Sequence, residues 1–415
     1  MNHFFKTTCA LSIAGLICIN TIGQTDRKDK AQFKAKSNDF YDQIKKGVET
    51  FEEPKKPAPP LAFRMDFSGI DIPKSTSEFK TVFAQKPESQ GETGTCWCFS
   101  TTSYYESEIK RLSNQDIQLS ELFTVYWQYV EKAKEFVRTR GTSLFDEGSE
   151  TGEVGKTMKT YGVVPLEAYN GMKPGQTYHN HKKMVEEMVR YLAFVKNANQ
   201  WNPDEVIATI KSIMNFYIGE PPVTVTVAGK KMTPLEYLKN VTKLTPDDYV
   251  DVMSFIEAPY WTQAEYKVPD NWNHTADYNN VPLNDFMAAI KNGIKNGYSI
   301  SIGGDVSESG MDNKLGVMMI PSYDIPSAYI DEYARQMRFS NGSTTDDHAM
   351  HLVGYAEKAN GTWYLIKDSG SGGQNNQTAP GYWFMHEDFV KLKMTTITIH
   401  KDAVKDLLAK CQKKS

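Results

Sequence analysis

The sequence predicts an α+β fold, because helical and strand patterns occupy different parts of the 415-residue chain. Helical patterns follow one another between residues 96 and 162, whereas residues 298 to 401 hold short β-branched and aromatic runs separated by turn residues. Helices first and strands later are typical of an α+β protein whose two halves face each other. With 40% hydrophobic residues, the chain can bury a large core.

The N-terminal residues predict export. Residues 1–24 combine Lys6 with the apolar run "TTCALSIAGLICINTIG", which has the length of a signal peptide and is too short to span a bilayer. We therefore expect a periplasmic or extracellular protein without stable membrane insertion. Residues 25–60 are charged and end in "FEEPKKPAPP", which predicts an extended spacer and leaves open an inhibitory pro-segment. The compact domain is expected over 61–415.

Charge and cysteine content exclude two classes of protein. The net charge of -4 offers no basic excess that would attract nucleic acid. Beyond the predicted signal the chain keeps Cys96, Cys98 and Cys411, an odd number that argues against a disulfide framework. At least one thiol is therefore better explained by chemistry, while Cys411, in a tail that we expect to be exposed, receives no role.

The helical patterns carry their own start and stop signals. The stretch "CWCFSTTSYYESEIKRL" predicts a mostly buried helix that begins at Cys96. The next helix is expected after Ser120, an N-cap with Glu121 in its first turn. A third, "TGEVGKTMKTYG", stops at Gly162. Residues 166–280 then alternate helical segments with polar loops, which predicts a helical insertion before the strands.

The segment "QGETGTCWCFS" carries the signature of a nucleophile. A reactive cysteine needs a lowered pKa, and Cys96 begins a helix after a loop that contains Gly91 and Gly94. Alone, the pattern fits a small buried residue equally well. Gln90, six residues earlier, changes the balance, because its amide and the backbone N–H of Cys96 could together stabilise an oxyanion.

A base for this thiol is found among the strands. His348 opens the strand "HAMHLVGY", and the next strand ends in Asp368, so adjacent antiparallel strands could hold the two side by side. We expect Asp368 to accept Nδ1–H of His348, with Nε2 toward the thiol. His351 is the rival, and strand alternation places it on the opposite face, packed or solvated. His179 and His181 are expected at the surface, without a metal.

With these positions in hand, the chain resembles a papain-like cysteine peptidase. The cysteine segment, "LSELF", "EGSETGEVGKTMKTYGVVP" and "DDHAMHLVGY…WYLIKDSG…GYW" are similar to that family's motifs and stand in its order over roughly residues 61 to 400. The separation 348 − 96 = 252 exceeds the usual papain spacing by roughly a hundred residues. The insertion, "HAM" and Thr93 in place of a loop cysteine resemble the bleomycin hydrolase and aminopeptidase C branch, among exported bacterial members.

Two departures from the family pattern concern the carboxylate. Asp368 stands where the family has asparagine, which adds a charge that should raise the pKa of His348. The tryptophan that normally shields this hydrogen bond is absent from "DSGSGG", and residues 369–373 form a glycine-rich run. We therefore expect a flexible segment and a wetter, less firmly held His348–Asp368 bond.

The resemblance also implies where substrate lies and what the tail does. Substrate would contact Gly94, Trp97, Gly148, Ser149 and Asp347, with Ser149 narrowing a contact that two glycines usually make. In the bleomycin hydrolase branch the chain's end enters the cleft and meets the substrate's α-amino group. Residues 402–415 could do the same, or could form a loosely held basic terminal helix.

The resulting prediction is a two-subdomain papain-like fold with a helical insertion that hydrolyses peptide bonds without a cofactor or metal. Cys96 would attack the scissile carbonyl, and His348 would shuttle the proton. Asp368 would orient His348, and Gln90 would stabilise the oxyanion. The expected activity is that of an aminopeptidase on peptides or unfolded proteins, with a hexamer implied by the resemblance. Alternatives are a catalytically weak or inactive papain-fold binding protein and an amidase that acts on non-peptide amides.

Overall fold

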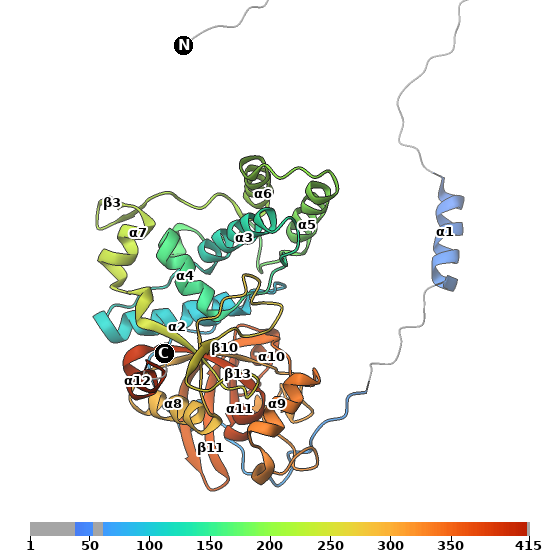
Figure 1. Ribbon diagram of the computed structural model, residues 1–415. Coiled ribbons are helices and arrows are strands. Elements are labelled where there is room, and N and C mark those ends of the chain that lie inside the picture. The colour runs from blue at the N-terminus through green and yellow to red at the C-terminus, as the bar shows by residue number, and fades with distance from the viewer. Residues whose placement is uncertain (1–37, 53–60, 413–415) are drawn as a thin grey trace, which may run out of the picture. The chain divides into compact units, whose positions relative to one another are not determined.

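The structure, a computed structural model, describes residues 38–52 and 61–412 (Figure 1). The chain divides into two units, Met1–Leu61 and Ala62–Ser415. In the first unit, helix α1 (Asp39–Glu52) occupies the charged stretch that precedes the predicted proline-rich spacer. Its apolar side chains, including Phe40 and Phe51, are exposed. The predicted signal and the proline-rich stretch lie outside the described residues, so the export prediction stays a prediction.

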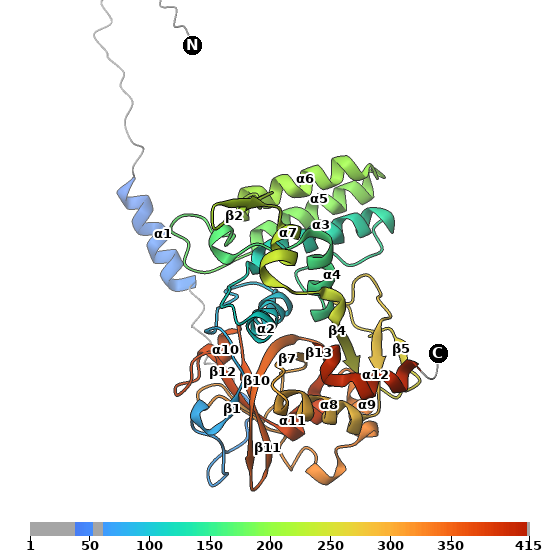
Figure 2. The same ribbon diagram turned by 90° about the vertical axis from the view of Figure 1, so that its left-hand side faces the viewer.

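The helical half of the second unit contains the first three predicted helices and most of the predicted insertion. Figure 2 shows α5 and α6 side by side, with α3 packed against α6. Its helices are α2 (Cys96–Ser113), α3 (Glu121–Arg138), α4 (Thr151–Tyr161), α5 (Lys182–Asn197), α6 (Pro203–Ile218) and α7 (Pro234–Tyr237). A separate hairpin joins β2 (Val225–Val227) to β3 (Lys230–Met232).

Local chemistry fixes these helix ends as predicted. Ser120 is the N-cap of α3, and its Oγ accepts the backbone N–H of Phe123 at 3.0 Å. Gly162 ends α4 with a φ of 78°, a left-handed value that glycine adopts without steric cost. The start of α2 at Cys96 is confirmed as well, with Thr95 as its N-cap.

The other half is built on one large sheet. The strand order is β5-β6-β4-β13-β7-β10-β11-β12-β9-β8, with β1 paired to β10. The strands are β1 (Lys80–Thr81), β4 (Tyr249–Met253), β5 (Thr262–Ala264), β6 (Tyr278–Asn280), β7 (Ile300–Gly304), β8 (Met311–Asp312), β9 (Val317–Met318), β10 (His348–Lys358), β11 (Gly361–Lys367), β12 (Tyr382–His386) and β13 (Met394–His400). The helices beside them are α8 (Leu283–Lys295), α9 (Glu332–Ser340), α10 (Ser371–Gln374), α11 (Glu387–Lys393) and α12 (Lys405–Gln412).

The predicted insertion differs from the structure near its end. Residues 166–280 are not only helical, because β4 joins the main sheet beside β13 and β6 then pairs with β4 in parallel. Short strands of three to five residues with polar neighbours carry little periodicity, which is why the sequence pattern did not reveal them. The insertion therefore extends both halves of the domain.

Strand β10 joins the two cores. Ala349 packs in the core of the helical half, whereas Met350 and Leu352 pack in the core of the sheet half. Alternation along one strand therefore places successive side chains in different cores. Helix α2 lies against β10 (Figure 1), and Cys96, its first residue, is close enough to His348, the first residue of β10, to interact with it.

The C-terminal tail, as far as Gln412, is a helix that is packed against the domain. Helix α12 packs beside α8, where Lys410 Nζ lies 2.7 Å from Asp285 Oδ1 (Figure 1). Leu407 and Cys411 are buried in the core of the sheet half, so the expectation that Cys411 is exposed and the helix loosely held is wrong. The last residues, 413–415, lie outside the described part of the chain.

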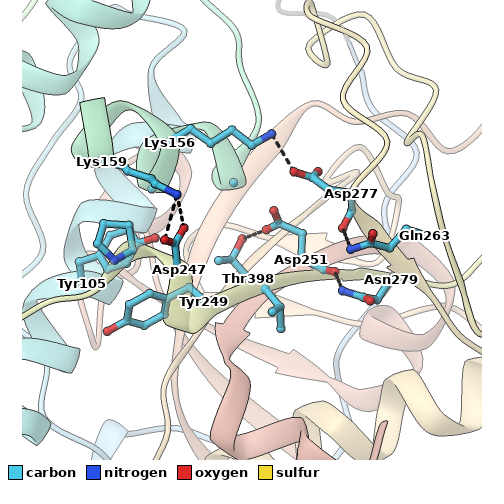
Figure 3. A pocket seen from close by; sticks show the side chains of 14 residues that line it. Tyr105, Lys156, Lys159, Asp247, Tyr249, Asp251, Gln263, Asp277, Asn279 and Thr398 are labelled. Atoms are coloured by element: carbon cyan, nitrogen blue, oxygen red, sulfur yellow. Dashed lines mark hydrogen bonds and ion pairs between the residues drawn. The ribbon is translucent and has the colours of Figure 1, made fainter. Parts of the chain in front are cut away.

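A polar cavity of about 350 Å³ lies where α4 meets the edge of the sheet (Figure 3). Lys159 of α4 pairs with Asp247 at 2.7 Å, and Lys156 pairs with Asp277 at 3.0 Å. Asp251, on β4, accepts a hydrogen bond from the Thr398 hydroxyl. None of the predicted catalytic residues lines this cavity. The ion pairs connect the helical half with the sheet half.

Asp251 predicts a pH-dependent stability. Burial raises its pKa from 3.8 to about 7. Between these values the folded protein keeps a proton that the unfolded chain releases, so raising the pH favours unfolding. Asp251→Asn cannot ionise and can still accept from Thr398. We expect the variant to match the wild type at pH 4 and to be more stable at pH 8 by about 1–3 kcal/mol, as measured by urea unfolding.

Asp247→Asn is the matched control for this measurement. Asp247 is exposed and paired with Lys159, so its replacement should change stability by less than about 1 kcal/mol. An equal effect of Asp251→Asn at both pH values would contradict the explanation based on burial.

Candidate active site

The predicted nucleophile is the first residue of α2. Cys96 follows the N-cap Thr95, and the backbone N–H groups of Cys98 and Phe99 donate to the Thr95 carbonyl. The first N–H groups of a helix have no partner within the helix and carry partial positive charge, which favours an anion at this end. Cys96 is partly exposed, whereas Cys98 is buried and its Sγ lies 3.3 Å from the Glu121 carbonyl. Burial raises the pKa of Cys98 well above its usual value.

The Gln90 side chain is fixed on the loop before α2. Its Nε2 donates to the Thr93 carbonyl at 2.7 Å, and its Oε1 accepts from Ser369 Oγ at 2.8 Å. An amide nitrogen carries two hydrogens, so one remains for an oxyanion. Thr93, at the position where the family's cysteine is missing, donates its hydroxyl to the Gln90 carbonyl instead. Hydrogen bonds thus hold this loop where no disulfide does.

Strand pairing brings His348 and Asp368 together. His351 of β10 pairs with Lys367 of β11, so the beginning of β10 lies beside the residues that follow β11. His348 Nε2 lies 2.7 Å from Asp368 Oδ1. The His348 side chain is 14% exposed and that of Asp368 only 3%, so the pair is largely shielded from water.

The imidazole is oriented opposite to our expectation. Asp368 contacts Nε2, not Nδ1, which leaves Nδ1 as the ring nitrogen available to Cys96. Burial by itself would lower the pKa of His348, but the charge of Asp368 and interaction with Cys96 outweigh it and raise that pKa well above 6.5. For Asp368 the balance has the opposite sign. Burial by itself would raise its pKa, but the His348 charge and the hydrogen bonds outweigh burial and lower that pKa. Both changes favour an ion pair at neutral pH.

The predicted wet and flexible surroundings of Asp368 are wrong. Trp383 of β12 donates Nε1–H to Asp368 Oδ2 at 2.9 Å and so supplies an indole from a different part of the sequence. Backbone N–H groups of Gly370 and Gly373 donate to Oδ1 and Oδ2 at 2.9 and 3.1 Å. The glycine-rich run is ordered by the short helix α10. Four donors therefore converge on this carboxylate.

The residues predicted to contact substrate meet around Glu147. Gly94 N–H donates to the Glu147 carboxylate at 2.5 Å, and Trp97 Nε1–H donates to the Glu147 carbonyl at 3.0 Å. Gly148 follows directly, and a Cβ there would lie 2.3 Å from an Asp270 oxygen. Gly94, Trp97 and Gly148 are thus close neighbours at the start of α2.

Ser149 does not narrow the contact as predicted. Its side chain is buried, and its Oγ accepts from Gln128 Nε2 at 3.1 Å and Trp272 Nε1 at 3.2 Å. Both partners lie in the protein interior, so the hydroxyl is directed away from solvent. Through these two hydrogen bonds, Ser149 fixes the backbone that follows Gly148.

Asp347 and two further carboxylates, those of Asp346 and Glu150, lie near these residues. Asp347 is exposed, accepts the backbone N–H of Val306 at 2.9 Å and lines a cavity together with His348. Burial raises the pKa of Asp346 to about 7 and that of Glu150 well above its usual range. Glu150 Oε1 is buried and has no hydrogen-bond partner among the described residues. The sequence did not single out Asp346 or Glu150.

The other histidines are not at this site. His351 is fully buried and shares a hydrogen bond of 2.9 Å with Ser103 Oγ of α2, which agrees with the predicted packed position. The surface prediction for His179 and His181 is wrong, since they are only 6% and 1% exposed. Burial lowers their pKa values to about 4 and about 3. In the described part of the chain, no cluster of three or more histidines, cysteines or carboxylates could hold a metal ion.

Sequence reasoning missed Trp383, Ser369 and Glu147. Trp383 acts from the strand after Asp368, and only the register of β11 with β12 reveals it, since Lys367 pairs with Tyr382. Ser369 holds Gln90 across 279 residues of sequence. The one available signal was local: Glu147 stands next to the glycine that was predicted to contact substrate.

Comparison with known proteins agrees with this geometry. The model of the Peptidase C1-like family matches residues 145–415. The chain belongs to the Peptidase C1-like family. This peptidase is 24% identical to Aminopeptidase C of Listeria monocytogenes, over 80% of its own length and 85% of that protein. Against mitochondrial cysteine proteinase 1 of Saccharomyces cerevisiae it is 21% identical, over 64% of each chain.

The solved structures confirm the fold class. The crystal structure of PepW from Lactobacillus rhamnosis superposes with a TM-score of 0.64 and 16% identity, over 92% of this chain and 95% of that one. This peptidase therefore has the predicted papain-like α+β fold. The family model and the relatives named Aminopeptidase C and cysteine proteinase 1 identify it as a cysteine peptidase. In residues 38–52 and 61–412, no helix is both long and apolar enough to cross a membrane.

Proposed function

We propose that this cysteine peptidase is an aminopeptidase whose acyl-enzyme forms on Cys96. The observation that carries the proposal is the hydrogen bond of 2.7 Å between His348 Nε2 and Asp368 Oδ1. It leaves Nδ1 of His348 for Cys96, and the raised pKa of His348 makes this ring a positively charged partner for the thiolate. An imidazolium beside a thiol at a helix N-terminus stabilises the thiolate, the nucleophilic form.

In the proposed reaction each of the four predicted residues has its own role. The Cys96 thiolate attacks the carbonyl carbon, and the resulting oxyanion accepts the free Gln90 N–H and the backbone N–H of Cys96. His348 gives its Nδ1 proton to the departing nitrogen, and the C–N bond breaks. His348 then takes a proton from water, which attacks the thioester; Cys96 leaves and the carboxylic acid is released. Asp368 keeps the ring oriented through Nε2.

Two observations support action on a free N-terminus. The relative with the higher coverage quoted above is named Aminopeptidase C. In addition, the side of the site that holds Gly148 carries the Asp270 carboxylate, which lies against the Gly148 backbone, and the Glu147 carboxylate, which accepts the Gly94 N–H. Carboxylates attract the ammonium group of a peptide's first residue.

Matched fluorogenic substrates test the proposal. Alanyl-aminomethylcoumarin has a free α-amino group, and its N-acetyl derivative differs only in lacking that charge. We expect kcat/KM for the free amine to exceed that for the acetylated substrate by about 100-fold, because only the free amine can pair with the carboxylates. Equal turnover would contradict the exopeptidase assignment, and turnover of neither would favour the binding-protein alternative.

A further inference from the structure

Lys132, on α3, is a buried lysine that the proposed reaction does not use. It is only 1% exposed, and the hydrogen bonds of its ammonium group go to backbone carbonyls. An ammonium group loses its hydration when it is buried, so lysines are rarely found in a protein interior unless a charged partner compensates for that loss. Buried charged groups of this kind are concentrated at functional sites.

The Lys132 ammonium connects the residues on either side of Glu147. Its Nζ lies 2.7 Å from the Asp146 carbonyl oxygen, and it also donates to the Gly148 carbonyl. A charged donor forms a stronger hydrogen bond with a carbonyl than a neutral donor does. One ammonium group therefore fixes the backbone before and after Glu147.

Glu147 in turn contacts the chain on both sides of Cys96. Its carboxylate accepts the Gly94 N–H at 2.5 Å, and its carbonyl accepts Trp97 Nε1–H at 3.0 Å. Gly94 precedes Cys96 by two residues, and Trp97 follows it directly. The packing is close, since a Cβ on Gly94 would lie 2.9 Å from the Glu147 Cβ. A shift of Glu147 would thus be passed on to the start of α2.

We infer that Lys132 is a positioning residue for Cys96, which acts through Glu147 and depends on its positive charge. While the ammonium group holds both carbonyls, Glu147 keeps the start of α2 in place. Small displacements of reacting atoms lower a rate by up to about 100-fold, so a loosened Glu147 should slow every reaction of Cys96. The inference rests on the proposed role of Cys96 as the nucleophile, but not on the preference for a free N-terminus.

The charge of Lys132 can be removed by pH as well as by mutation. Burial lowers the pKa of Lys132 to about 8, although four carboxylates around it act in the opposite direction: Asp270, Asp146, Glu153 and Glu147. Burial raises the pKa of Glu147, whereas the Gly94 hydrogen bond and the Lys132 charge lower it. Lys132 is therefore charged at pH 6 and mostly neutral at pH 9, which weakens its hold on the two carbonyls.

The test compares kcat/KM of the wild type and Lys132→Met for alanyl-aminomethylcoumarin at pH 6 and pH 9. Methionine keeps the apolar stem of lysine but has neither charge nor N–H groups. We expect the variant to be about 30-fold slower at pH 6 and less than about fivefold slower at pH 9, where the wild type has lost the charge too. His348 and the substrate amine titrate with both proteins, so their effects cancel in this ratio.

Lys134→Met is the matched control. Lys134 lies on the same helix but is exposed and paired with Glu131, so its replacement should leave kcat/KM unchanged at both pH values. A ratio of wild type to Lys132→Met that is the same at pH 6 and pH 9 would indicate a role in packing alone and would overturn the inference.

Glu147→Ala tests whether Lys132 acts through Glu147. The loss in Lys132→Met/Glu147→Ala should be no larger than that of the more damaging single substitution, whereas losses that multiply would contradict the inference. Glu147→Ala also serves if Lys132→Met does not fold. Its own loss should shrink between pH 6 and pH 9, because Glu147 is held in place only while Lys132 is charged.

The rate at which iodoacetamide alkylates Cys96 gives a readout that needs no turnover. Lys132→Met should lower this rate about tenfold at pH 6, because a displaced thiol loses its contact with His348. An unchanged alkylation rate would overturn the inference. Failure of the proposed function gives a different result, since the wild type would then not hydrolyse alanyl-aminomethylcoumarin at either pH.

Discussion

Cys96→Ala abolishes turnover while leaving the fold intact: this is the largest effect that we expect. The thiol is the group that forms the acyl-enzyme, and removing a nucleophile lowers kcat by about 10⁴-fold or more. Cys96 is partly exposed and is the first residue of α2, so its replacement should cost little stability. Initial rates with alanyl-aminomethylcoumarin and thermal unfolding curves of both proteins measure the two effects.

Alkylation of the wild type by iodoacetamide tests separately whether Cys96 is an activated thiol. Cys98 and Cys411 are buried, so among the three cysteines that follow the predicted signal, mass spectrometry of the folded wild type should show rapid modification at Cys96 alone. The His348 partner should accelerate this labelling, because the thiolate is the reactive form. Labelling of Cys96 no faster than that of a free thiol in solution would contradict activation by His348.

Asp368→Asn has the second largest expected effect, although it restores the family's usual residue. The carboxylate accepts four hydrogen bonds, from His348, Gly370, Gly373 and Trp383. An asparagine amide has one oxygen and one NH₂ group. Because each carboxylate oxygen of Asp368 accepts from two donors, the NH₂ group would face two N–H donors in either orientation and could not accept from them. If it faces His348, that ring must accept at Nε2 and carry its proton on Nδ1, which prevents it from receiving the thiol proton.

We therefore expect Asp368→Asn to lower kcat by about 100-fold or more and stability by about 2 kcal/mol. Kinetics and urea unfolding measure these changes. The pH profile adds a diagnostic readout. The Asp368 charge helps raise the pKa of His348, so the imidazolium persists to higher pH. Without that charge, the alkaline limb of kcat/KM should move to lower pH.

A double variant separates the hydrogen-bond argument from a general loss of packing. Trp383→Phe removes the indole donor that faces Asp368 Oδ2. In the wild-type background this substitution should lower the free energy of unfolding. In the Asp368→Asn background it should instead restore part of the lost stability, so the coupling energy between the two substitutions should be about 1–2 kcal/mol. Strictly additive losses would show that the Trp383 donor does not explain why this chain has aspartate.

Much of the fold follows from local sequence. Ser120 accepts from the first turn of α3 and Gly162 ends α4, and both features depend only on the chemistry of neighbouring residues. The long strands β10 and β11 were recognisable from their alternating and apolar composition. Short strands such as β6 were not, because their pairing partners, and not their own residues, make them strands.

For the site, the sequence determined which side chains are present and in what order. It identified Cys96 at a helix start and a histidine and carboxylate on successive strands, because these patterns are local. Tertiary structure decided what those groups face: the ring nitrogen that meets Asp368, the indole of Trp383 on the same carboxylate, and the buried positions of His179 and His181. Such facts depend on strand register and on packing between residues far apart in the chain, and spacing along one sequence does not encode them.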